Sequence, residues 1–527
     1  MPYVVTQSCC SDASCVYACP VNCIHPTPDE PDFLTAEMLY VDPKACVDCG
    51  ACATACPVDA IASSKKLTDE QLPFIEINAD FYRQARPRAL LAKPIPAAKV
   101  ESGHGPMRVA VVGSGPSAMY AADELLTQPG VSVTVFDRLP VPYGLARHGV
   151  APDHTRTRQV SRLFDVISAQ PGFGSYLNVA VGEHISHADL LDHFHAVIYA
   201  VGASADRKLG VPGEGLPGSV SATEFVAWYN GHPDHAGREF DLSQRRAVIV
   251  GNGNVALDVA RILTVDPETL SGTDVSPAAL DALRHSKIEE VVIVGRRGPA
   301  ESAFTVPEFV GLLGADVDIV VDGQVPETVA GMPQKVEQKL RLLRGAADRP
   351  VGARKRIVFR YLSSPTALLG ADRVTGIELE RNDLRTGDDG TTRAVGTGET
   401  ETLDAGLVLT SVGYRGVALP GLPFDEKANV IPNREGRVLD APDGAVFPAT
   451  YVTGWIKRGP TGFIGTNKSC AQETVRQLVD DFNAGRLPEP ASSAADFDHL
   501  ITTRRPAAIR GGATSRPWWK RKLLART

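Results

Sequence analysis

Nine of the ten cysteines of this chain lie within its first 56 residues, and their spacing limits how that segment can fold. They form two runs. The complete run has the pattern C-x2-C-x2-C-x3-C-P, and its candidate ligands are Cys46, Cys49, Cys52 and Cys56. In this pattern three thiolates on a tight loop hold one iron–sulfur cluster, while the fourth thiolate, just before proline, reaches across to a second cluster.

The other run keeps the spacing but has a carboxylate at its second ligand position, so that its candidate ligands are Cys9, Asp12, Cys15 and Cys19. Each cluster should draw ligands from both runs. We assign a [4Fe-4S] cluster to Cys19, Cys46, Cys49 and Cys52. We assign the second cluster to Cys9, Cys15 and Cys56, with Asp12 facing its fourth iron position. Because a carboxylate is a harder and weaker ligand for that iron than a thiolate, we expect a [3Fe-4S] cluster, or a [4Fe-4S] cluster after conversion.

Other uses of these cysteines fit the pattern less well. A structural zinc site usually takes two separated cysteine pairs rather than four cysteines in eleven residues followed by proline. Disulfides do not fit, because only Cys470 follows residue 56. Cys10 and Cys23 have no place in the ligand scheme. We expect them to be small buried residues beside the clusters, with Cys10 able to replace Asp12 after a local rearrangement.

The acidic charge of the chain is concentrated at its N-terminus. The formal net charge of the 527 residues is −8, and residues 1–78 alone hold eleven Asp or Glu against three Lys. Such a unit beside a nearly neutral body either docks by charge steering or is simply kept soluble by its acids. The charge argues against nucleic-acid binding. No stretch approaches the roughly 20 apolar residues of a membrane helix, and no leader precedes Cys9, so we expect a cytoplasmic protein without a membrane partner.

Two later segments share the pattern of a short β-branched strand, a glycine turn and a helix with apolar spacing. They are MRVAVVGSGPSAMYAADELL (107–126) and RAVIVGNGNVALDVARIL (246–263). In the dinucleotide-binding pattern the first glycine makes the turn, the second admits a pyrophosphate, and a third small residue packs helix on strand. These positions are Gly113, Gly115 and Ala118, then Gly251, Gly253 and Ala256. One match is weak evidence, but two complete matches predict two nucleotide sites.

The residues that end the second strand of each unit distinguish the two nucleotides. The first unit ends at Asp137, whose carboxylate can accept hydrogen bonds from the ribose hydroxyls of FAD. The second unit ends in Arg296 and Arg297, where a carboxylate would indicate NAD. Two guanidiniums suit the 2′-phosphate of NADP(H). The alternative for the arginines is a solvated surface pair.

The order of these elements predicts an α/β protein in which two nested Rossmann-like dinucleotide-binding domains follow a small α+β ferredoxin-like iron–sulfur domain. Strands at 195–203 and 407–416 would carry the chain between the nested domains. The expected parts are a two-cluster domain (1–78), a linker (79–106), the first part of the FAD domain (107–210), the NADP domain (211–410), the second part of the FAD domain (411–483) and a basic C-terminal tail (484–527). The segment 504–527 has eight Lys or Arg and no acid, which suits a loosely held tail or an arm that docks on the acidic domain.

A glycine-rich segment at 451–475 precedes a helix that we expect to begin near Thr466 or Asn467. Backbone amides and the positive end of that helix suit a loop that cradles the flavin. Trp455 suits stacking or hydrogen bonding at the cofactor, with a buried structural role as the alternative.

With these motifs the chain resembles an adrenodoxin-reductase-type ferredoxin–NADP⁺ reductase fused behind a bacterial-type two-cluster ferredoxin. The reductase resemblance spans about residues 107–483 and rests on strings such as PVPYGLARHGVAPDH, VVIVGRRGPAESAFT and GWIKRGPTGFIGTNK. The resemblance implies FAD contacts from Asp137, Leu145, Val181, Trp455, Gly462, Phe463 and Ile464. It implies NADP contacts from Asn252, Gly253, Asn254, Val255, Arg296, Arg297, Glu308 and Gly462.

One departure from the resemblance concerns His154, in the string GVAPDH. Relatives carry a carboxylate three residues beyond the position of Glu308, whereas this chain has Gly311. If the histidine normally pairs with that carboxylate near the flavin, the arrangement here must differ. His154 is therefore a candidate for positioning a proton or a water molecule, with a structural histidine as the alternative.

The reaction implied by the motifs and the resemblance is electron transfer between NADPH and iron–sulfur clusters through FAD. A hydride would pass to the flavin, and single electrons would pass to the fused or an external ferredoxin, or to a monooxygenase chain with a cytochrome P450. The alternatives are an iron–sulfur and flavin redox sensor, or a glutamate-synthase-like NADPH oxidoreductase subunit, which has a different cysteine pattern. A flavin disulfide reductase is excluded, because it needs a redox-active cysteine pair beside FAD.

Overall fold

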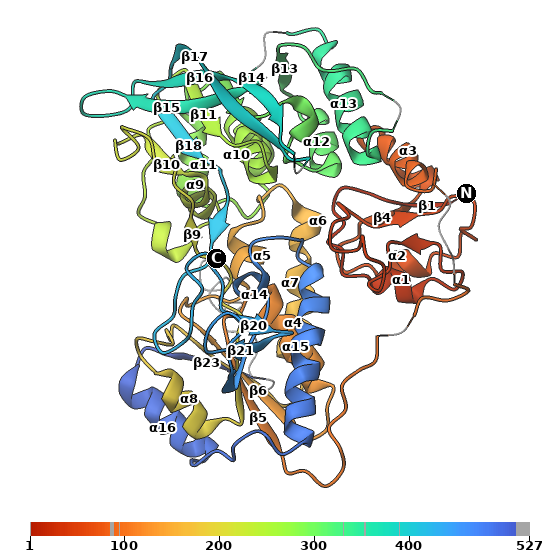
Figure 1. Cartoon of the computed structure of the whole chain (residues 1–527), viewed down its shortest axis with the longest axis vertical. Coiled ribbons are helices and arrows are strands. Elements are labelled where there is room, and N and C mark those ends of the chain that lie inside the picture. Colours follow the sequence, from red (N-terminus) through yellow and green to blue (C-terminus); the bar gives the residue numbers. More distant parts are fainter. Residues whose placement is uncertain are drawn as a thin grey trace.

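The computed structural model describes residues 2–84, 89–93, 95–329, 331–352, 355–388 and 390–512. They form an N-terminal cysteine-rich unit, an eight-stranded sheet with its helices and a six-stranded sheet with its helices (Figure 1). Among the helices of these ranges, none is long and apolar enough to cross a membrane. Short 3₁₀ turns occur at Ser64–Lys66, Asp69–Gln71, Pro233–His235, Pro267–Leu270 and Pro299–Glu301.

The N-terminal unit combines two short antiparallel strand pairs with three helices. The strand pairs are β1 (Tyr3–Val5) with β4 (Ile61–Ser63) and β2 (Ile24–His25) with β3 (Tyr40–Val41). The helices are α1 (Ser14–Ala18), α2 (Ala51–Ala55) and α3 (Pro73–Asp80). Each cysteine run forms one of the two five-residue helices, and buried side chains such as Val16, Ile24 and Met38 give the unit a core of its own.

The two cysteine runs share one backbone conformation. Ser11 and Asp48 occupy equivalent places and are both left-handed, with φ of 60° and 58°. The residues that immediately precede α1 and α2 are left-handed as well, with φ of 60° and 79°. Asp12 therefore takes the same position on its loop that Cys49 takes on the other.

The eight-stranded sheet has the order β20-β21-β22-β8-β5-β6-β7-β23, and the strands from β22 to β7 run parallel. The strands are β5 (Met107–Val112), β6 (Val131–Asp137), β7 (Phe173–Leu177), β8 (Ala196–Tyr199), β20 (Asn433–Arg434), β21 (Arg437–Leu439), β22 (Val446–Val452) and β23 (Ile509–Gly512).

Helices cover both faces of this sheet, which is typical of parallel strands. One face carries α4 (Pro116–Leu126), α7 (Val160–Ser168) and α15 (Thr466–Asn483), and the other carries α8 (His187–His193) and α16 (Ala494–Arg504). Strand β5 shows the alternation, because Val109 and Val111 pack towards α4 while Ala110 and Val112 pack towards α8.

The six-stranded sheet is wholly parallel, with the order β10-β18-β11-β12-β14-β13. Its strands are β10 (Ser219–Ser221), β11 (Arg246–Val250), β12 (Glu290–Val294), β13 (Asp318–Asp322), β14 (Arg356–Arg360) and β18 (Leu407–Thr410). One face packs on α9 (Ala222–Tyr229), α10 (Asn254–Thr264), α11 (Pro277–Arg284), α12 (Val306–Leu313) and α13 (Gln334–Ala347). The other face packs on an antiparallel sheet of β15 (Ser363–Leu369), β16 (Gly376–Thr386) and β17 (Thr392–Asp404), which the sequence did not predict.

A two-stranded ribbon joins the two large sheets. The chain leaves the eight-stranded sheet after β8 through β9 (Ala205–Asp206) and returns after β18 through β19 (Tyr414–Arg415), and these two strands pair antiparallel. The six-stranded sheet is thus formed by a segment inserted between two parts of the eight-stranded sheet, as the nested arrangement requires.

The segment 484–512 is structured, and the expectation of a loosely held tail at 504–527 is wrong for residues 509–512, which form β23. Strand β23 pairs antiparallel with β7 at the edge of the eight-stranded sheet, and Phe497 and Ile501 of α16 are buried against that sheet. The rest of the basic segment, 513–527, lies outside the described residues.

Candidate functional site

The two glycine turns have the same geometry at the carboxyl ends of their sheets. Gly113 and Gly251 have φ of 104° and 110°, and an added Cβ would lie 2.5 Å and 2.1 Å from a backbone oxygen after the neighbouring strand. Only glycine fits there. Gly115 and Gly253 immediately precede α4 and α10, and a Cβ added to either would find no atom within 4 Å. Each turn therefore leaves space for a phosphate at a helix N-terminus, which fits a dinucleotide.

Residues behind the turns fix them to the sheets. Ala118 and Ala256 are fully buried where the helices pack on the strands. In the second turn, Asn252 Oδ1 accepts a hydrogen bond from the backbone of residue 303 at 3.3 Å, and Asn254 Oδ1 accepts one from residue 305 at 2.8 Å. Val255 packs partly buried against the same core. These contacts hold the loop after β12 against the second glycine turn.

The residues predicted to distinguish the nucleotides lie beside the expected turns. Asp137 ends β6 and accepts backbone hydrogen bonds from Ser114 at 3.0 Å and Leu139 at 2.9 Å, and burial raises the pKa of its carboxyl group. Arg296 is exposed and Arg297 is half-buried. They follow β12, which pairs in register with β11, so both arginines lie next to the turn that follows β11.

The glycine-rich loop at residues 459–465 lies against the first glycine turn. Ser117 Oγ, in the first turn of α4, is 2.7 Å from Asn467 Oδ1 at the start of α15. Gly462 has φ of 84°, and the backbone of Phe463 donates to Thr466 Oγ1 at 2.9 Å. Ile464 packs partly buried against the core beneath.

Three further predicted FAD contacts lie in different surroundings. Trp455 begins α14 (Trp455–Arg458), and its indole donates to the carbonyl of Thr461 at 3.0 Å, at the start of the glycine-rich loop. Leu145 is 40% exposed on α5 (Gly144–His148), the helix whose first residue approaches Gly115. Val181 packs on the face of the sheet that carries α8 and α16, away from the glycine-rich loop.

The cysteine ligands fall into two groups. The ligands that we assigned to a [4Fe-4S] cluster line one small pocket, and they are Cys19, Cys46, Cys49 and Cys52. These four thiols, which line the pocket together with Cys23, are a donor set that fits this cluster. Cys23 Sγ lies 3.4 Å from Cys19 Sγ at the wall of the pocket, so Cys23 is buried beside the cluster site, as expected.

The second group consists of Cys9, Cys15 and Cys56 with Asp12. Burial raises the pKa of the Cys9 thiol to about 11, and the nearby charges of Cys56 and Asp12 add to the effect. Burial and the charges of Cys9, Asp12 and Cys56 likewise raise the pKa of the Cys15 thiol. Asp12 is buried and accepts a hydrogen bond from Ser14 Oγ. Three thiols and one carboxylate therefore lie together, which fits a second cluster with one altered iron position.

The loop of this second group lies directly on the glycine-rich loop. The backbone of Gly465 donates a hydrogen bond to the carbonyl of Cys10 at 2.7 Å. A Cβ added to Gly465 would lie 2.2 Å from the backbone nitrogen of Asp12. Cys10 itself is buried in the core that contains Ala118 and Tyr120 of α4. The absence of a side chain at Gly465 thus allows the two loops to meet backbone to backbone.

The N-terminal unit also contacts the helices of the six-stranded sheet, beside α13 in Figure 1. Glu37 pairs with Lys339 at 3.0 Å and accepts a hydrogen bond from the first backbone amide of α12 at 2.7 Å. Glu76 and Asp80 pair with Arg341 at 2.7 Å and 3.1 Å. Acids of the unit therefore meet bases of the body, which favours charge steering over solubility alone.

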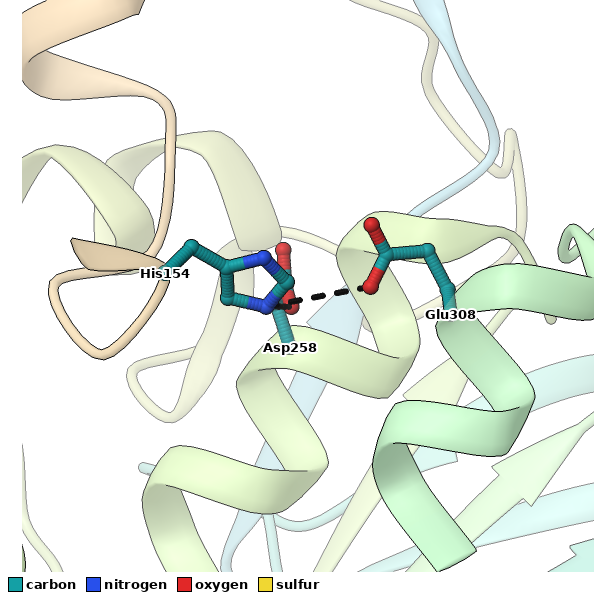
Figure 2. A group of neighbouring side chains, drawn as sticks. All are labelled: His154, Asp258 and Glu308. Atoms are coloured by element: carbon teal, nitrogen blue, oxygen red, sulfur yellow. Dashed lines mark ion pairs between the residues drawn. The ribbon is translucent and has the colours of Figure 1, made fainter. Parts of the chain in front are cut away.

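Three charged side chains meet where the chain segments come together, and Figure 2 shows His154 pointing at Asp258 of α10 and Glu308 of α12. His154 Nε2 lies 3.1 Å from Asp258 Oδ1 and 3.7 Å from Glu308 Oε2. Burial opposes the charge of the imidazole, but the two carboxylates outweigh it and raise the pKa of His154 to about 9. The histidine is therefore an imidazolium at neutral pH.

The arrangement of His154 differs from the one that the resemblance implies, as the glycine at position 311 required. Asp258 supplies the nearer carboxylate. It was not predicted from the sequence, because the only local sign is an acidic residue within a largely apolar helix. Glu308, expected at NADP, faces His154 and Gln7. Gln7 and Gly465 were also missed, because a contact between segments so far apart in the chain leaves no local pattern.

Parts of the chain match two protein families. The family described as pyridine nucleotide-disulphide oxidoreductase matches residues 107–297. The family described as 4Fe-4S binding domain matches residues 39–62, which include the complete cysteine run.

Individual proteins are similar over much longer stretches. A probable ferredoxin/ferredoxin–NADP reductase of Mycobacterium tuberculosis is 54% identical over 97% of this chain and 89% of its own length. The NADPH-ferredoxin reductase FprA of the same organism is 48% identical over 78% of this chain and 92% of its own length. The structure of M. tuberculosis FprA in complex with NADPH matches with a TM-score of 0.71 and 44% identity, covering 77% of this chain and 92% of that one.

Proposed function

The chain belongs to the ferredoxin/ferredoxin–NADP reductase family, with a reductase part of the adrenodoxin reductase type. We therefore propose the order in which electrons pass through the domains of this chain. The enzyme transfers electrons between NADPH and ferredoxin through FAD. When bound, FAD would supply the chemistry that links two-electron hydride transfer from the nicotinamide to one-electron transfer, and the protein's residues would bind and orient it. Residues of both nucleotide-binding domains and of the ferredoxin domain share these tasks.

Two sets of residues are suited to hold the nucleotides. For FAD they are Gly113, Gly115, Ala118, Asp137, Leu145, Val181, Trp455, Gly462, Phe463 and Ile464. For NADPH they are Asn252, Gly253, Asn254, Val255, Arg296, Arg297, Glu308 and Gly462. Open space at Gly115 and Gly253 supports the phosphate positions, and the arginine pair beside the second turn supports NADPH over NADH.

We assign two clusters to the ferredoxin domain. The thiols that line one pocket support a [4Fe-4S] cluster at Cys19, Cys46, Cys49 and Cys52. The group of Cys9, Cys15 and Cys56 with a buried carboxylate supports a [3Fe-4S] cluster, because Asp12 takes the loop position of the cysteine that would bind a fourth iron.

The single observation that carries the proposed order is the backbone contact between Cys10 and Gly465. It sets the Cys9–Cys15 loop against the flavin-binding part of the chain, so this loop is the side on which the ferredoxin domain receives electrons from the reductase. Cys49 is exposed on the other loop, and neighbouring Val47 is 58% exposed. The Cys46–Cys52 loop is therefore the side that passes electrons to an external acceptor.

The acceptor is a ferredoxin or a monooxygenase chain with a cytochrome P450, and the cysteine usage suits the reducing cytoplasm. The nested division of the chain is supported by the β9–β19 ribbon beside the boundaries at 210 and 411. We extend the second part of the FAD domain to residue 512, because β23 belongs to its sheet.

We expect Asp12→Cys to convert the second cluster into a stable [4Fe-4S] cluster. The residues on either side of Asp12 have the same left-handed conformation as those on either side of Cys49, so a thiolate at position 12 should need no rearrangement of the loop. Electron paramagnetic resonance of the protein as purified should lose its [3Fe-4S] signal, and iron analysis should find one more iron per chain.

Asp69→Cys provides the matched control, because Asp69 is exposed in a 3₁₀ turn of the same domain. This variant should keep the spectrum of the unaltered protein. A [3Fe-4S] signal that persists in Asp12→Cys would show that position 12 does not face the missing iron.

A further inference from the structure

Gly311 leaves a notch in α12 that a residue of the ferredoxin domain fills. A Cβ at this position would lie 2.1 Å from Gln7 Nε2 and 2.4 Å from Gln7 Cδ. Gly311 is an interior residue of the helix, where glycine is less favourable than alanine. Gln7 is two residues from Cys9 in the chain, so the filled notch lies close to the first cysteine run.

The carboxamide in the notch is hydrogen-bonded to the reductase. Gln7 Nε2 donates to Glu308 Oε2 at 2.9 Å, across 301 residues of sequence. The same carboxylate oxygen lies 3.7 Å from His154 Nε2. A continuous set of contacts thus runs from the ferredoxin domain through Glu308 to the imidazolium of the reductase.

We propose that Gln7 is a positioning residue for the reductase, which holds Glu308 and through it His154 in place when the ferredoxin domain is docked. The proposal deepens the reductase function and rests on it. The site at His154 is then complete only with the ferredoxin domain in its notch. Docking of the cluster domain and the charge at His154 are coupled.

The charged groups around His154 determine whether loss of the Gln7 contact raises or lowers the pKa of His154. From α10 the imidazole faces Asp258 and the guanidinium of Arg261, which also pairs with Asp153 at 2.6 Å, and from α12 it faces Glu308. A hydrogen bond from the Gln7 amide stabilises the ionised form of Glu308. Without this bond the carboxylate of Glu308 is no longer held 3.7 Å from His154, its attraction for the imidazolium weakens, and the pKa of His154 falls below about 9.

Two variants test the proposal by different means. Gln7→Ala removes the donor, and Gly311→Ala fills the notch and displaces the carboxamide. We expect each to lower the pKa of His154 by about one pH unit, the size expected when one of two nearby carboxylates is no longer held beside the imidazolium. The measurement is a pH titration of the holoprotein with ¹³C-labelled histidine by NMR. The His154 resonance is identified by its loss in His154→Gln.

The double variant and a matched control separate positioning from general damage. Because Gln7→Ala removes the atoms that an alanine at 311 would meet, the double variant should shift the pKa no further than either single variant. Gln84→Ala, at an exposed glutamine, should cause no shift. A His154 pKa that stays unchanged in Gln7→Ala, or shifts that add in the double variant, would overturn the proposal.

The NADPH-dependent reduction of ferricyanide gives an independent readout. The alkaline limb of its pH profile should move to lower pH in Gln7→Ala and Gly311→Ala and remain in place in Gln84→Ala. A limb that stays in place while the NMR titration shifts would overturn the coupling to the reductase. Absence of ferricyanide reduction in the unaltered protein would contradict the reductase function instead, and the NMR titration would still test Gln7.

Discussion

Replacement of Gly465 by alanine should slow the reduction of the iron–sulfur clusters while the flavin is still reduced by NADPH. The added Cβ would lie 2.2 Å from the nitrogen and 2.4 Å from the Cα of Asp12, and backbone atoms cannot rotate away. Gly465 has φ of −76° and ψ of −24°, which alanine adopts without strain. The effect of the substitution is therefore confined to the contact between the two loops.

Forcing one methyl group into a close-packed contact costs on the order of 1–3 kcal/mol, which changes a docking equilibrium by about 5- to 150-fold. We expect the clusters to be reduced about tenfold more slowly or worse. The measurement is the loss of cluster absorbance after anaerobic mixing with NADPH, with the reduction of ferricyanide and the flavin content measured on the same preparation.

Gly345→Ala is the matched control for this prediction. Gly345 is an exposed glycine of α13, and a Cβ added there would find no atom within 4 Å. This variant should reduce its clusters at the unaltered rate. Normal cluster reduction in Gly465→Ala would mean that electrons do not enter the ferredoxin domain through the Cys9–Cys15 loop.

Replacement of both Arg296 and Arg297 by alanine should reverse the preference for NADPH over NADH. Hydrogen bonds to a charged partner contribute roughly 1.5–3 kcal/mol each, so loss of both guanidiniums should lower kcat/KM for NADPH by about 100-fold or more. NADH has no 2′-phosphate, and its kcat/KM should change by less than about threefold. Steady-state reduction of ferricyanide with each nucleotide gives both values.

Arg245→Ala tests whether loss of any surface arginine has this effect. Arg245 immediately precedes β11, so it lies at the amino ends of the strands, opposite to the glycine turn, and it pairs with Glu289 on the surface. An exposed ion pair of this kind is worth about 0–1 kcal/mol, and neither nucleotide should be affected. Equal losses for NADPH and NADH in the double variant would contradict a role of Arg296 and Arg297 in binding the 2′-phosphate.

The sequence predicted the features whose chemistry is local. Cysteine spacing determines which thiols can reach one cluster, and the four thiols that the spacing selects line one pocket together with Cys23. The positive φ of Gly113 and Gly251 is the reason why glycine occurs there. Both kinds of pattern depend on a few neighbouring residues and can therefore be read without a structure.

Features that depend on contacts between distant segments were not predictable. The role of Gln7 depends on its contact with the helix position of Gly311, and neither residue lies in a distinctive sequence motif. Strand β23 has the sequence IRGG, whose two glycines give no strand signal, and it is held by pairing with β7. The β15–β17 sheet has largely polar strands, because only the residues that face the six-stranded sheet are buried.

The central claim is that electrons from NADPH enter the ferredoxin domain of the same chain on the side of the Cys9–Cys15 loop. It is tested most directly by anaerobic stopped-flow mixing with NADPH, followed by freezing at set times for electron paramagnetic resonance. We predict that the flavin absorbance bleaches first, that the [3Fe-4S] signal then changes, and that the [4Fe-4S] cluster is reduced last. A flavin that bleaches while both clusters stay oxidised, or a [4Fe-4S] cluster reduced before the other, would contradict the claim.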